Sequence, residues 1–495
     1  MVKTIKQDEK ERRRDYENSI KCRILAINPP IEDFKVQGGL IFPLGLLVII
    51  SVLKKAGAHI DFIDCMNPED KAVKKALKVD SVYYNVFGTC CSMETETKRP
   101  DILSDVPRPW KLFGMNYDLL LKELGEYKTP NVILITSGLT YHYRSVFKTI
   151  SVLKKAFSNV PILLGGIYAT LCYEHAVKFS NADYVVRGPG ERIIIDLLKN
   201  KYNTNISNIP MNNHDEIPGP DLGVYFQRST RLRHAPIMMN RGCPFKCSYC
   251  ASDQLSGFVQ YSIDNVFQYI IKCVSFGIRS FIFYDDALLI NGSSRIDVLL
   301  RKIQARKLRV YFSTPNSMHA RYITQRRAEL MKACGFRYLR LSIETTDHFR
   351  MKENPKISTT EFLKAVDYLK AAGFDYRNIG VYYMVGQPAQ TRNDMIDTMM
   401  FIYKQNVIAI PLQYSPIPGT RDYIKAVADG IINIDMDPLL TNRECFLFSG
   451  DETQRETVKR IMRLASCLKR SIEYNCNFSD TDPVSARVRV LLSAM

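Results

Sequence analysis

Residues 241–250 read RGCPFKCSYC and place Cys243, Cys247 and Cys250 on one short loop. A structural zinc site closes with four protein ligands, and no second cysteine pair or HxxxH follows at the usual spacing. A cubane [4Fe-4S] cluster held by three thiolates keeps one iron open for an external ligand. The CxxxCxxC spacing therefore predicts such a cluster, with incidental or zinc-binding cysteines as the alternative.

Strands and helices alternate along the chain around and after this loop. The expected strands read PIMMNRG (236–242), RSFIFYD (279–285), LRVYFST (308–314), RYLRLSI (337–343), IGVYYMV (379–385) and AIPLQYS (409–415). Helical patterns separate them, and this alternation favours parallel βαβ units. Six such repeats predict a partial (β/α)6 barrel over residues 233–425, with its chemistry at the carboxyl ends of the strands.

The cysteine spacing, the aromatic Tyr249 before the last cysteine and the six βα repeats together resemble the radical S-adenosylmethionine (radical SAM) enzymes. In that family the open iron binds the amino and carboxylate groups of SAM, and one electron cleaves SAM to a 5′-deoxyadenosyl radical. The resemblance implies that Cys243, Cys247 and Cys250 ligate the cluster. It also implies that Tyr249 contacts the adenine.

Further SAM contacts are implied at the ends of later strands. Asp285 and Asp286 follow FIFY, where family members bind the SAM amino group, although the family's Gly-Gly-Glu is absent. Ser342 and Glu344 end the fourth strand, where ribose or carboxylate contacts occur, with helix capping as the competing role. Gly386 resembles the glycine of the family's adenine site, although Gln387 and Ala389 depart from the GLPGET variant.

Residues 21–200 carry a second strand and helix series. The expected strands read CRILAIN (22–28), HIDFID (59–64), NVILITS (131–137), VPILLGG (160–166) and DYVVRG (183–188). The fold class is therefore α/β, with a doubly wound, Rossmann-like sheet in front of the barrel. A polar insertion at 65–130, which contains Trp110, interrupts the alternation.

Two turns follow strands of this sheet: Ser137, Gly138 and Leu139 end one strand, and Gly165 and Gly166 end the next. Glycine lets a backbone approach a large ligand closely, although tight turns alone would also explain these residues. With its SxL and GG turns, the domain resembles the cobalamin-binding domain that precedes many radical SAM barrels. The resemblance implies a cobalamin site at these turns, with an empty, degenerate domain as the alternative.

The DxHxxG motif, which supplies a histidine to cobalt in that family, is missing after the first strand. We therefore expect no protein histidine on cobalt. His142 follows the SxL turn and could line the pocket, but a solvent-facing loop histidine is the favoured interpretation.

The remaining segments complete the domain plan. A charged extension forms residues 1–20, a linker rich in Asn, Pro and Gly spans 201–232, and a mostly helical segment forms 426–495. The apolar window 40–53 is shorter than the roughly 20 residues of a membrane span and contains Pro43, so we expect a buried helix.

Composition excludes several classes of protein. With 46% hydrophobic and 24% charged residues in 495, wholesale disorder, collagen and coiled coils are disfavoured. The net charge of +17 would suit an RNA or a phosphorylated cofactor, but the basic residues are spread along the chain, which favours a solvated surface. The thirteen cysteines and the missing secretion signal indicate a cytoplasmic protein.

The sequence thus predicts a radical SAM enzyme, specifically a cobalamin-dependent methyltransferase that acts on an unreactive carbon or phosphorus centre. A cyclase, a rearrangement enzyme or a methylthiolation enzyme is the first alternative, and a non-catalytic RNA- or cobalamin-binding module is the second. The expected partners are a small-molecule or peptide substrate and a reducing electron donor such as flavodoxin or ferredoxin. Nucleic acid is not favoured.

Overall fold

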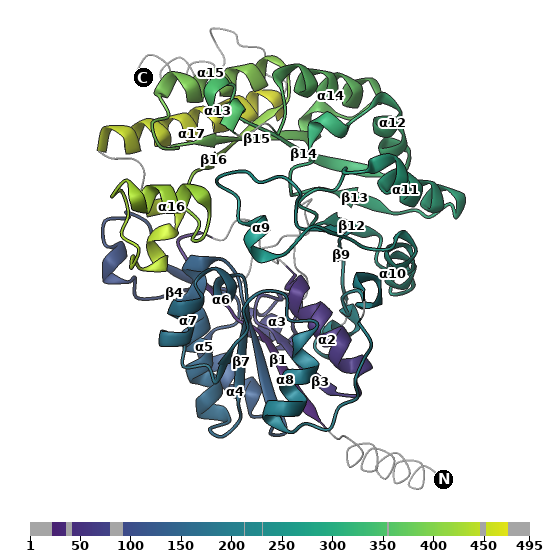
Figure 1. Ribbon diagram of the computed structural model, residues 1–495, viewed down its shortest axis with the longest axis vertical. Coiled ribbons are helices and arrows are strands. Elements are labelled where there is room, and N and C mark those ends of the chain that lie inside the picture. The colour runs from purple at the N-terminus through teal and green to yellow at the C-terminus, as the bar shows by residue number, and fades with distance from the viewer. Residues whose placement is uncertain are drawn as a thin grey trace. The chain divides into compact units, whose positions relative to one another are not determined.

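The computed structural model describes residues 22–35, 42–79, 93–211, 213–229, 231–353, 356–445 and 452–473. These residues form two compact units (Figure 1). Among them, unit 1 takes residues up to 99 and from 108 to 232, and unit 2 takes 100–107 and those from 233 onward. The expected extension 1–20 lies outside the described residues.

Unit 1 is built on a parallel sheet of five strands. In spatial order these are β3 (His59–Asp64), β1 (Arg23–Asn28), β6 (Val132–Ser137), β7 (Ile162–Gly166) and β8 (Tyr184–Val185). The strand order reverses between β1 and β6, which is the topological switch point where doubly wound sheets bind ligands. The predicted Rossmann-like fold is confirmed.

Helices cover this sheet because the connections between its parallel strands need crossovers. They are α2 (Leu44–Lys55), α3 (Lys71–Leu77), α4 (Tyr117–Leu124), α5 (Tyr143–Ala156), α6 (Ile167–Leu171), α7 (Tyr173–Phe179) and α8 (Ile193–Tyr202). Helix α2 packs on β1 and β3 through a largely buried apolar face, and Lys54 and Lys55 lie in its last turn. Cations there stabilise the helix dipole. Residues 44–53 of the predicted window thus lie in a largely buried helix, as predicted, while residues 40 and 41 lie outside the described residues.

Part of the polar insertion is ordered. Strand β5 (Lys111–Phe113) pairs antiparallel with β2 (Ile31–Asp33) on one side and β4 (Glu94–Glu96) on the other. Trp110 is 3% exposed and meets Phe34 edge-on, with ring centroids 4.9 Å apart. The insertion therefore adds a small sheet to unit 1 and buries the chain's only tryptophan.

Residues 213–229, in the segment expected to be a linker, pack against unit 1. They contain two 3-10 helices, η3 (His214–Glu216) and η4 (Leu222–Gln227). Tyr225 of η4 is 1% exposed, and its hydroxyl donates to Asp64 at the end of β3 over 2.6 Å. This part of the chain therefore covers the sheet.

Unit 2 contains the predicted partial barrel, a parallel sheet of six strands. In spatial order these are β9 (His234–Ile237), β12 (Ser280–Phe283), β13 (Tyr311–Ser313), β14 (Phe336–Glu344), β15 (Ile379–Val385) and β16 (Ile408–Gln413). A short antiparallel pair, β10 (Asn240–Arg241) and β11 (Val259–Gln260), follows β9. Sequence order equals spatial order, as repeated βα units require.

The helices of unit 2 alternate with these strands (Figure 1). They are α9 (Ser252–Leu255), α10 (Ile263–Ser275), α11 (Ile296–Ala305), α12 (Gln325–Ala333), α13 (His348–Glu353), α14 (Thr359–Ala371), α15 (Arg392–Lys404), α16 (Arg421–Ala428) and α17 (Glu452–Glu473). Helix α17 packs on β16 and α15, so the helical segment predicted at the C-terminus covers the last repeat.

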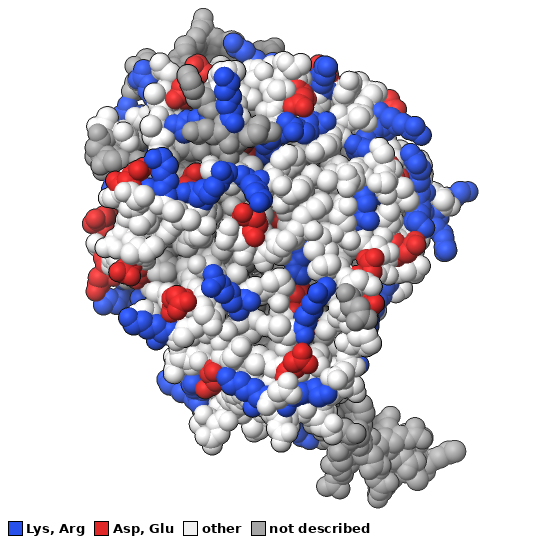
Figure 2. Space-filling view, viewed as in Figure 1, with Lys and Arg blue, Asp and Glu red and all other residues white. Residues whose placement is uncertain are grey.

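The charged side chains do not gather on one patch of the face in Figure 2. Lys and Arg are scattered across it, with Asp and Glu among them. Within the part of the chain that the structure describes, no helix is long and apolar enough to span a bilayer.

Asp64 is a buried carboxyl group at the carboxyl end of β3. It is 2% exposed and accepts hydrogen bonds from Tyr225 Oη, Asn28 Nδ2 and Met66 N at 2.6, 2.7 and 3.0 Å. Burial raises the pKa of Asp64 to about 6, although the three hydrogen bonds oppose the shift. Between pH ~4 and pH ~6, Asp64 is therefore protonated in the folded protein and ionised in the unfolded chain.

We expect Asp64→Asn to change the pH dependence of unit 1. The stabilisation from the raised pKa is complete below pH ~4 and is lost as pH rises to ~6, a change of about 3 kcal/mol. The amide of the variant does not ionise. The difference in unfolding free energy, variant minus parent, should therefore rise by this amount between pH ~4 and pH ~6. Urea unfolding followed by Trp110 fluorescence measures it, and parallel pH profiles would contradict it.

Candidate functional site

The cysteine loop begins at the carboxyl end of the first barrel strand. Its first residues form β10, which pairs with β11 through Asn240 and Gln260. Gly242 has φ +70°, and a Cβ there would lie 2.8 Å from the carbonyl oxygen of Gly257. The close return of the chain therefore requires glycine directly before Cys243.

Asp285 holds the start of this loop. Its carboxylate accepts hydrogen bonds from Met239 N at 3.0 and 3.2 Å and from Asn240 N at 2.6 Å. Burial raises the pKa of Asp285 to about 8, whereas these backbone donors lower it. Sequence analysis expected Asp285 at the SAM amino group, but its oxygens are engaged by the backbone, which gives it a positioning role.

Residues from another loop and from helix α16 hold the middle of the cysteine loop. The Phe245 ring stacks on His319, with centroids 4.9 Å apart and an interplanar angle of 26°. From α16, the backbone N–H of Asp422 donates to Ser248 O at 3.0 Å, and Arg421 donates to Lys246 O. The loop is thus tied to the barrel on both sides of Cys247.

The three thiols of the loop are free, and none of them is in a disulfide. Burial raises the pKa of Cys243 to about 11 and also raises the pKa of Cys247. Three thiolates on one loop are the donors that a [4Fe-4S] cluster with one open iron needs. The donor set therefore fits such a cluster.

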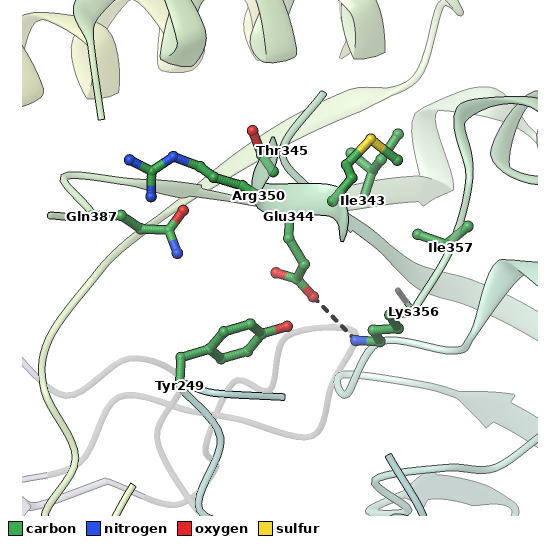
Figure 3. A pocket seen from close by; sticks show the side chains of 9 residues that line it. Tyr249, Ile343, Glu344, Thr345, Arg350, Lys356, Ile357 and Gln387 are labelled. Atoms are coloured by element: carbon green, nitrogen blue, oxygen red, sulfur yellow. Dashed lines mark hydrogen bonds and ion pairs between the residues drawn. The ribbon is translucent and has the colours of Figure 1, made fainter. Parts of the chain in front are cut away.

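A pocket lies beside this loop, and Figure 3 shows its lining side chains. It holds about 330 Å³, part of it open to solvent. The lining residues are Tyr249, Ile343, Glu344, Thr345, Arg350, Met351, Lys356, Ile357 and Gln387. The pocket thus combines an aromatic ring, aliphatic surface and charges of both signs.

Lys356 and Glu344 form the charged centre of the pocket (Figure 3). Lys356 Nζ lies 3.1 Å from Glu344 Oε1 and 3.0 Å from Ser342 Oγ, and the two charged side chains are 13% and 15% exposed. Burial lowers the pKa of Lys356, but the charges of Glu344 and Cys247 raise it more, so the net shift is upward. Lys356 is therefore a retained cation close to the cysteine loop.

Glu344 is held in an unusual backbone conformation. Its φ is +60°, and the pairing of β14 with β15 shifts register between Ser342 and Glu344. A left-handed conformation is uncommon for a residue other than glycine and costs free energy, and such residues concentrate at functional sites. The local kink directs the Glu344 carboxylate toward Lys356.

The structure brings several of the predicted SAM residues together. Tyr249 and Glu344 line the pocket, and Ser342 binds Lys356. Gly386, with φ +78°, directly precedes the pocket residue Gln387. Asp286 does not line it.

Asp286 is linked instead to the third cysteine. Its Oδ2 accepts from Ser252 Oγ at 3.2 Å, and Ser252 Oγ lies 3.3 Å from Cys250 Sγ. Asp286 therefore lies near the cysteine loop rather than in the pocket.

Four residues of the site were missed by sequence analysis: Lys356, Arg350, Gln387 and His319. The first three line the pocket, and His319 stacks on the cysteine loop. Arg350 lies in α13 and Lys356 follows that helix, in a polar stretch of sequence that carries no motif. Only their position after β14, at the carboxyl edge of the sheet, could have indicated them.

The two predicted turns of unit 1 meet at the carboxyl ends of β6 and β7. Ser137 Oγ donates to Gly165 O at 2.7 Å and accepts from Ala169 N at 3.2 Å. A Cβ on Gly166 would lie 2.3 Å from Ser137 O. Gly166 is therefore required by the contact between the two turns themselves.

The surface beside these turns fits a large, partly apolar ligand. Gly138 and Gly166 are exposed, and a Cβ on Gly138 would meet only His142 Nδ1, at 3.6 Å. Leu139 and Ile167 flank them with 46% and 37% exposed side chains. Because the edge lies next to the switch point, its open backbone and apolar rim suit cobalamin.

His142 was wrongly interpreted as a solvent-facing histidine. It is 8% exposed, and its Nε2 lies 3.2 Å from Asp33 Oδ2. Asp33 is the last residue of β2 and is itself 5% exposed. The two residues are far apart in sequence, so the pattern around His142 could not reveal this partner.

Comparison with family models assigns both units. Residues 237–402 match the radical SAM superfamily, and residues 114–198 match the B12 binding domain. The chain thus carries a radical SAM domain and, in front of it, a B12 binding domain. Its cofactors are a [4Fe-4S] cluster, SAM and cobalamin.

Curated relatives are distant. An uncharacterized methyltransferase of Pyrococcus horikoshii is 25% identical over 331 residues, 61% of this chain and 71% of that protein. The anaerobic magnesium-protoporphyrin IX monomethyl ester cyclase of Cereibacter sphaeroides is 26% identical over 164 residues, 28% of this chain and 26% of that protein.

Among solved structures, the radical SAM methyltransferase TsrM of Kitasatospora setae has a similar fold. TsrM with cobalamin and a [4Fe-4S] cluster bound gives a TM-score of 0.61 at 14% identity, over 88% of this chain and 83% of that chain. TsrM with tryptophan substrate and a SAM analog gives 0.60 at 14% identity, over 87% and 84%. These likenesses support the order of the two domains.

Two glycines of unit 1 should respond differently to an added methyl group. Gly166 has φ 102° and ψ −167°, a region open almost only to glycine, and faces a 2.3 Å backbone contact. We expect Gly166→Ala to destabilise unit 1 by at least about 2 kcal/mol. The control Gly138→Ala should change stability by less than about 1 kcal/mol, because its Cβ has room. Thermal unfolding followed by Trp110 fluorescence measures the stability of both variants. Equal losses of stability would contradict the structural requirement for glycine at Gly166.

Proposed function

We propose that this protein is a cobalamin-dependent radical SAM methyltransferase. The observation that carries the proposal is the three-cysteine loop beside a charged pocket, in a chain that also has a B12 binding domain. When bound, the cluster supplies the electron that cleaves SAM, and cobalamin supplies a carrier for a methyl group. The protein's own residues bind these groups, orient them and keep water out.

In this proposal the pocket of unit 2 binds SAM. SAM carries a carboxylate, an ammonium, a sulfonium and an adenine ring, and the pocket offers a partner for each kind of group. Lys356 and Arg350 are the cations for the carboxylate, and Glu344 is the anion for the positive groups. Tyr249, with the aliphatic Ile343 and Ile357, provides the surface for the adenine.

Cobalamin would bind at the exposed edge of Gly138, Leu139, Gly165 and Gly166. This edge offers backbone without side chains and an apolar rim, and Ser137 holds the two turns together. The similar proteins favour methyl transfer, because one of them is a methyltransferase and TsrM is a radical SAM methyltransferase.

A cyclisation reaction is the second candidate, because part of the chain is similar to a cyclase. Methylthiolation is less favoured: in the described part of unit 1, Cys22 and Cys65 are buried and Cys172 is partly buried, and these cysteines gather in no metal site. Cys90 and Cys91 lie outside the described residues. A small-molecule or peptide substrate and a flavodoxin- or ferredoxin-type donor complete the proposed reaction.

The first test concerns the cluster. Removing one thiolate should abolish assembly, so Cys247→Ala should lose nearly all cluster iron and sulfide and more than about 90% of reductive SAM cleavage. Iron, sulfide and 5′-deoxyadenosine are measured after anaerobic reconstitution with dithionite. Cys273→Ala, at a cysteine buried in α10 away from the loop, is the control and should retain both. A Cys247→Ala protein that retained both would refute the cluster assignment.

The second test separates methyl transfer from cyclisation. Parent protein with methyl-labelled SAM should form S-adenosylhomocysteine, 5′-deoxyadenosine and labelled product together. Gly138→Phe should weaken cobalamin binding at least about tenfold and stop methylation, while SAM cleavage continues. Leu121→Phe, at an exposed position on α4, should bind cobalamin like the parent. Product formed without label transfer would favour cyclisation instead.

A further inference from the structure

His319 lies beside a predicted cluster ligand although it belongs to a different loop. It follows β13, directly before the 3-10 helix η6 (Ala320–Tyr322). Its Nε2 is 4.0 Å from Cys243 Sγ, a distance at which sulfur, the larger acceptor, still takes part in a hydrogen bond. The side chain is 3% exposed and stacks on Phe245, so the ring cannot turn away freely.

The other ring nitrogen indicates where the proton is. Nδ1 of His319 is buried and has no hydrogen-bond partner among the described residues. A buried N–H without a partner is rarer, and so costlier, than a buried acceptor without one. The favoured form therefore carries its proton on Nε2, the nitrogen that faces Cys243. A cysteine sulfur bound to iron has no proton of its own and can only accept.

We propose that His319 is a positioning residue that donates its Nε2–H to the Cys243 sulfur of the cluster and thereby raises the cluster's reduction potential. The inference rests on the proposed function, because it requires a cluster on Cys243. Hydrogen bonds to the sulfurs are among the factors that set the potential of an iron–sulfur cluster.

The direction of the effect follows from charge. Reduction adds one electron, from a flavodoxin- or ferredoxin-type donor, to a cluster whose negative charge then increases. A hydrogen-bond donor stabilises the more negative state more strongly. His319 thus makes the cluster easier to reduce, which is the step that precedes SAM cleavage. The stacked ring also covers this side of the cysteine loop from solvent.

Three substitutions separate the hydrogen bond from the packing. His319→Phe retains a ring that can stack on Phe245 but has no donor. His319→Gln retains a donor N–H near the position of Nε2, and His319→Asn has the same amide one methylene shorter, near the position of Nδ1. Phe and Asn should therefore lose the bond to sulfur, whereas Gln should keep it.

The experiment is an anaerobic redox titration of the reconstituted full-length protein without SAM, followed by the EPR signal of the reduced cluster. We expect His319→Phe and His319→Asn to lower the ratio of reduced to oxidised cluster on the order of tenfold at a given potential, a shift of about 59 mV to more negative values. His319→Gln should stay near the parent. An exchangeable-proton coupling in the parent and in His319→Gln should disappear in the other two.

Iron and sulfide content distinguish the ways in which this could fail. Equal midpoints in all four proteins at equal cluster content would overturn the role of His319 and leave the proposed function intact. A parent protein that assembles no cluster would overturn the proposed function and the inference with it. If His319→Phe fails to fold, the comparison of Gln with Asn decides alone, because these side chains differ only in reach.

Discussion

The cysteine loop depends on one buried carboxyl group. Asp285, at the end of the second barrel strand, binds the backbone N–H groups of Met239 and Asn240, directly before the first cysteine. Backbone amides are fixed in direction, so these bonds set the course of the chain where it leaves β9. The loop that follows carries all three thiols. The contacts further along this loop, at Phe245, Lys246 and Ser248, hold a chain whose direction Asp285 has already set.

Parallel topology explains why the remaining residues reach this loop. In a barrel built from consecutive βα units, every strand ends at the same edge, so loops distant in sequence become neighbours. His319 follows the third strand, Glu344 ends the fourth and Gln387 follows the fifth. The strained φ of Glu344 then directs its carboxylate to Lys356, which supplies the cation in a largely buried site.

In unit 1, too, the residues of interest lie at the carboxyl edge of the parallel sheet. Its two glycine turns approach so closely that Gly166 is a structural requirement, whereas Gly138 leaves exposed backbone. Glycines in these two turns thus serve different needs, and only the distances in the structure separate them. The buried His142, whose Nε2 lies 3.2 Å from Asp33 Oδ2, packs beside Gly138.

The sequence alone determined the elements and their order. Periodicity identified the strands of both parallel sheets, because buried parallel strands are short apolar runs between helical patterns. The predicted cluster ligands could also be read from the sequence, since all three cysteines lie within eight residues of one loop. Lys356, His319, the partner of His142 and the backbone contacts of Asp285 were not. These roles depend on pairs of side chains from separate loops, and a linear pattern holds no information on which loops fold together. The tertiary structure decided them because distance, burial and the direction of a hydrogen bond exist only once the chain has folded.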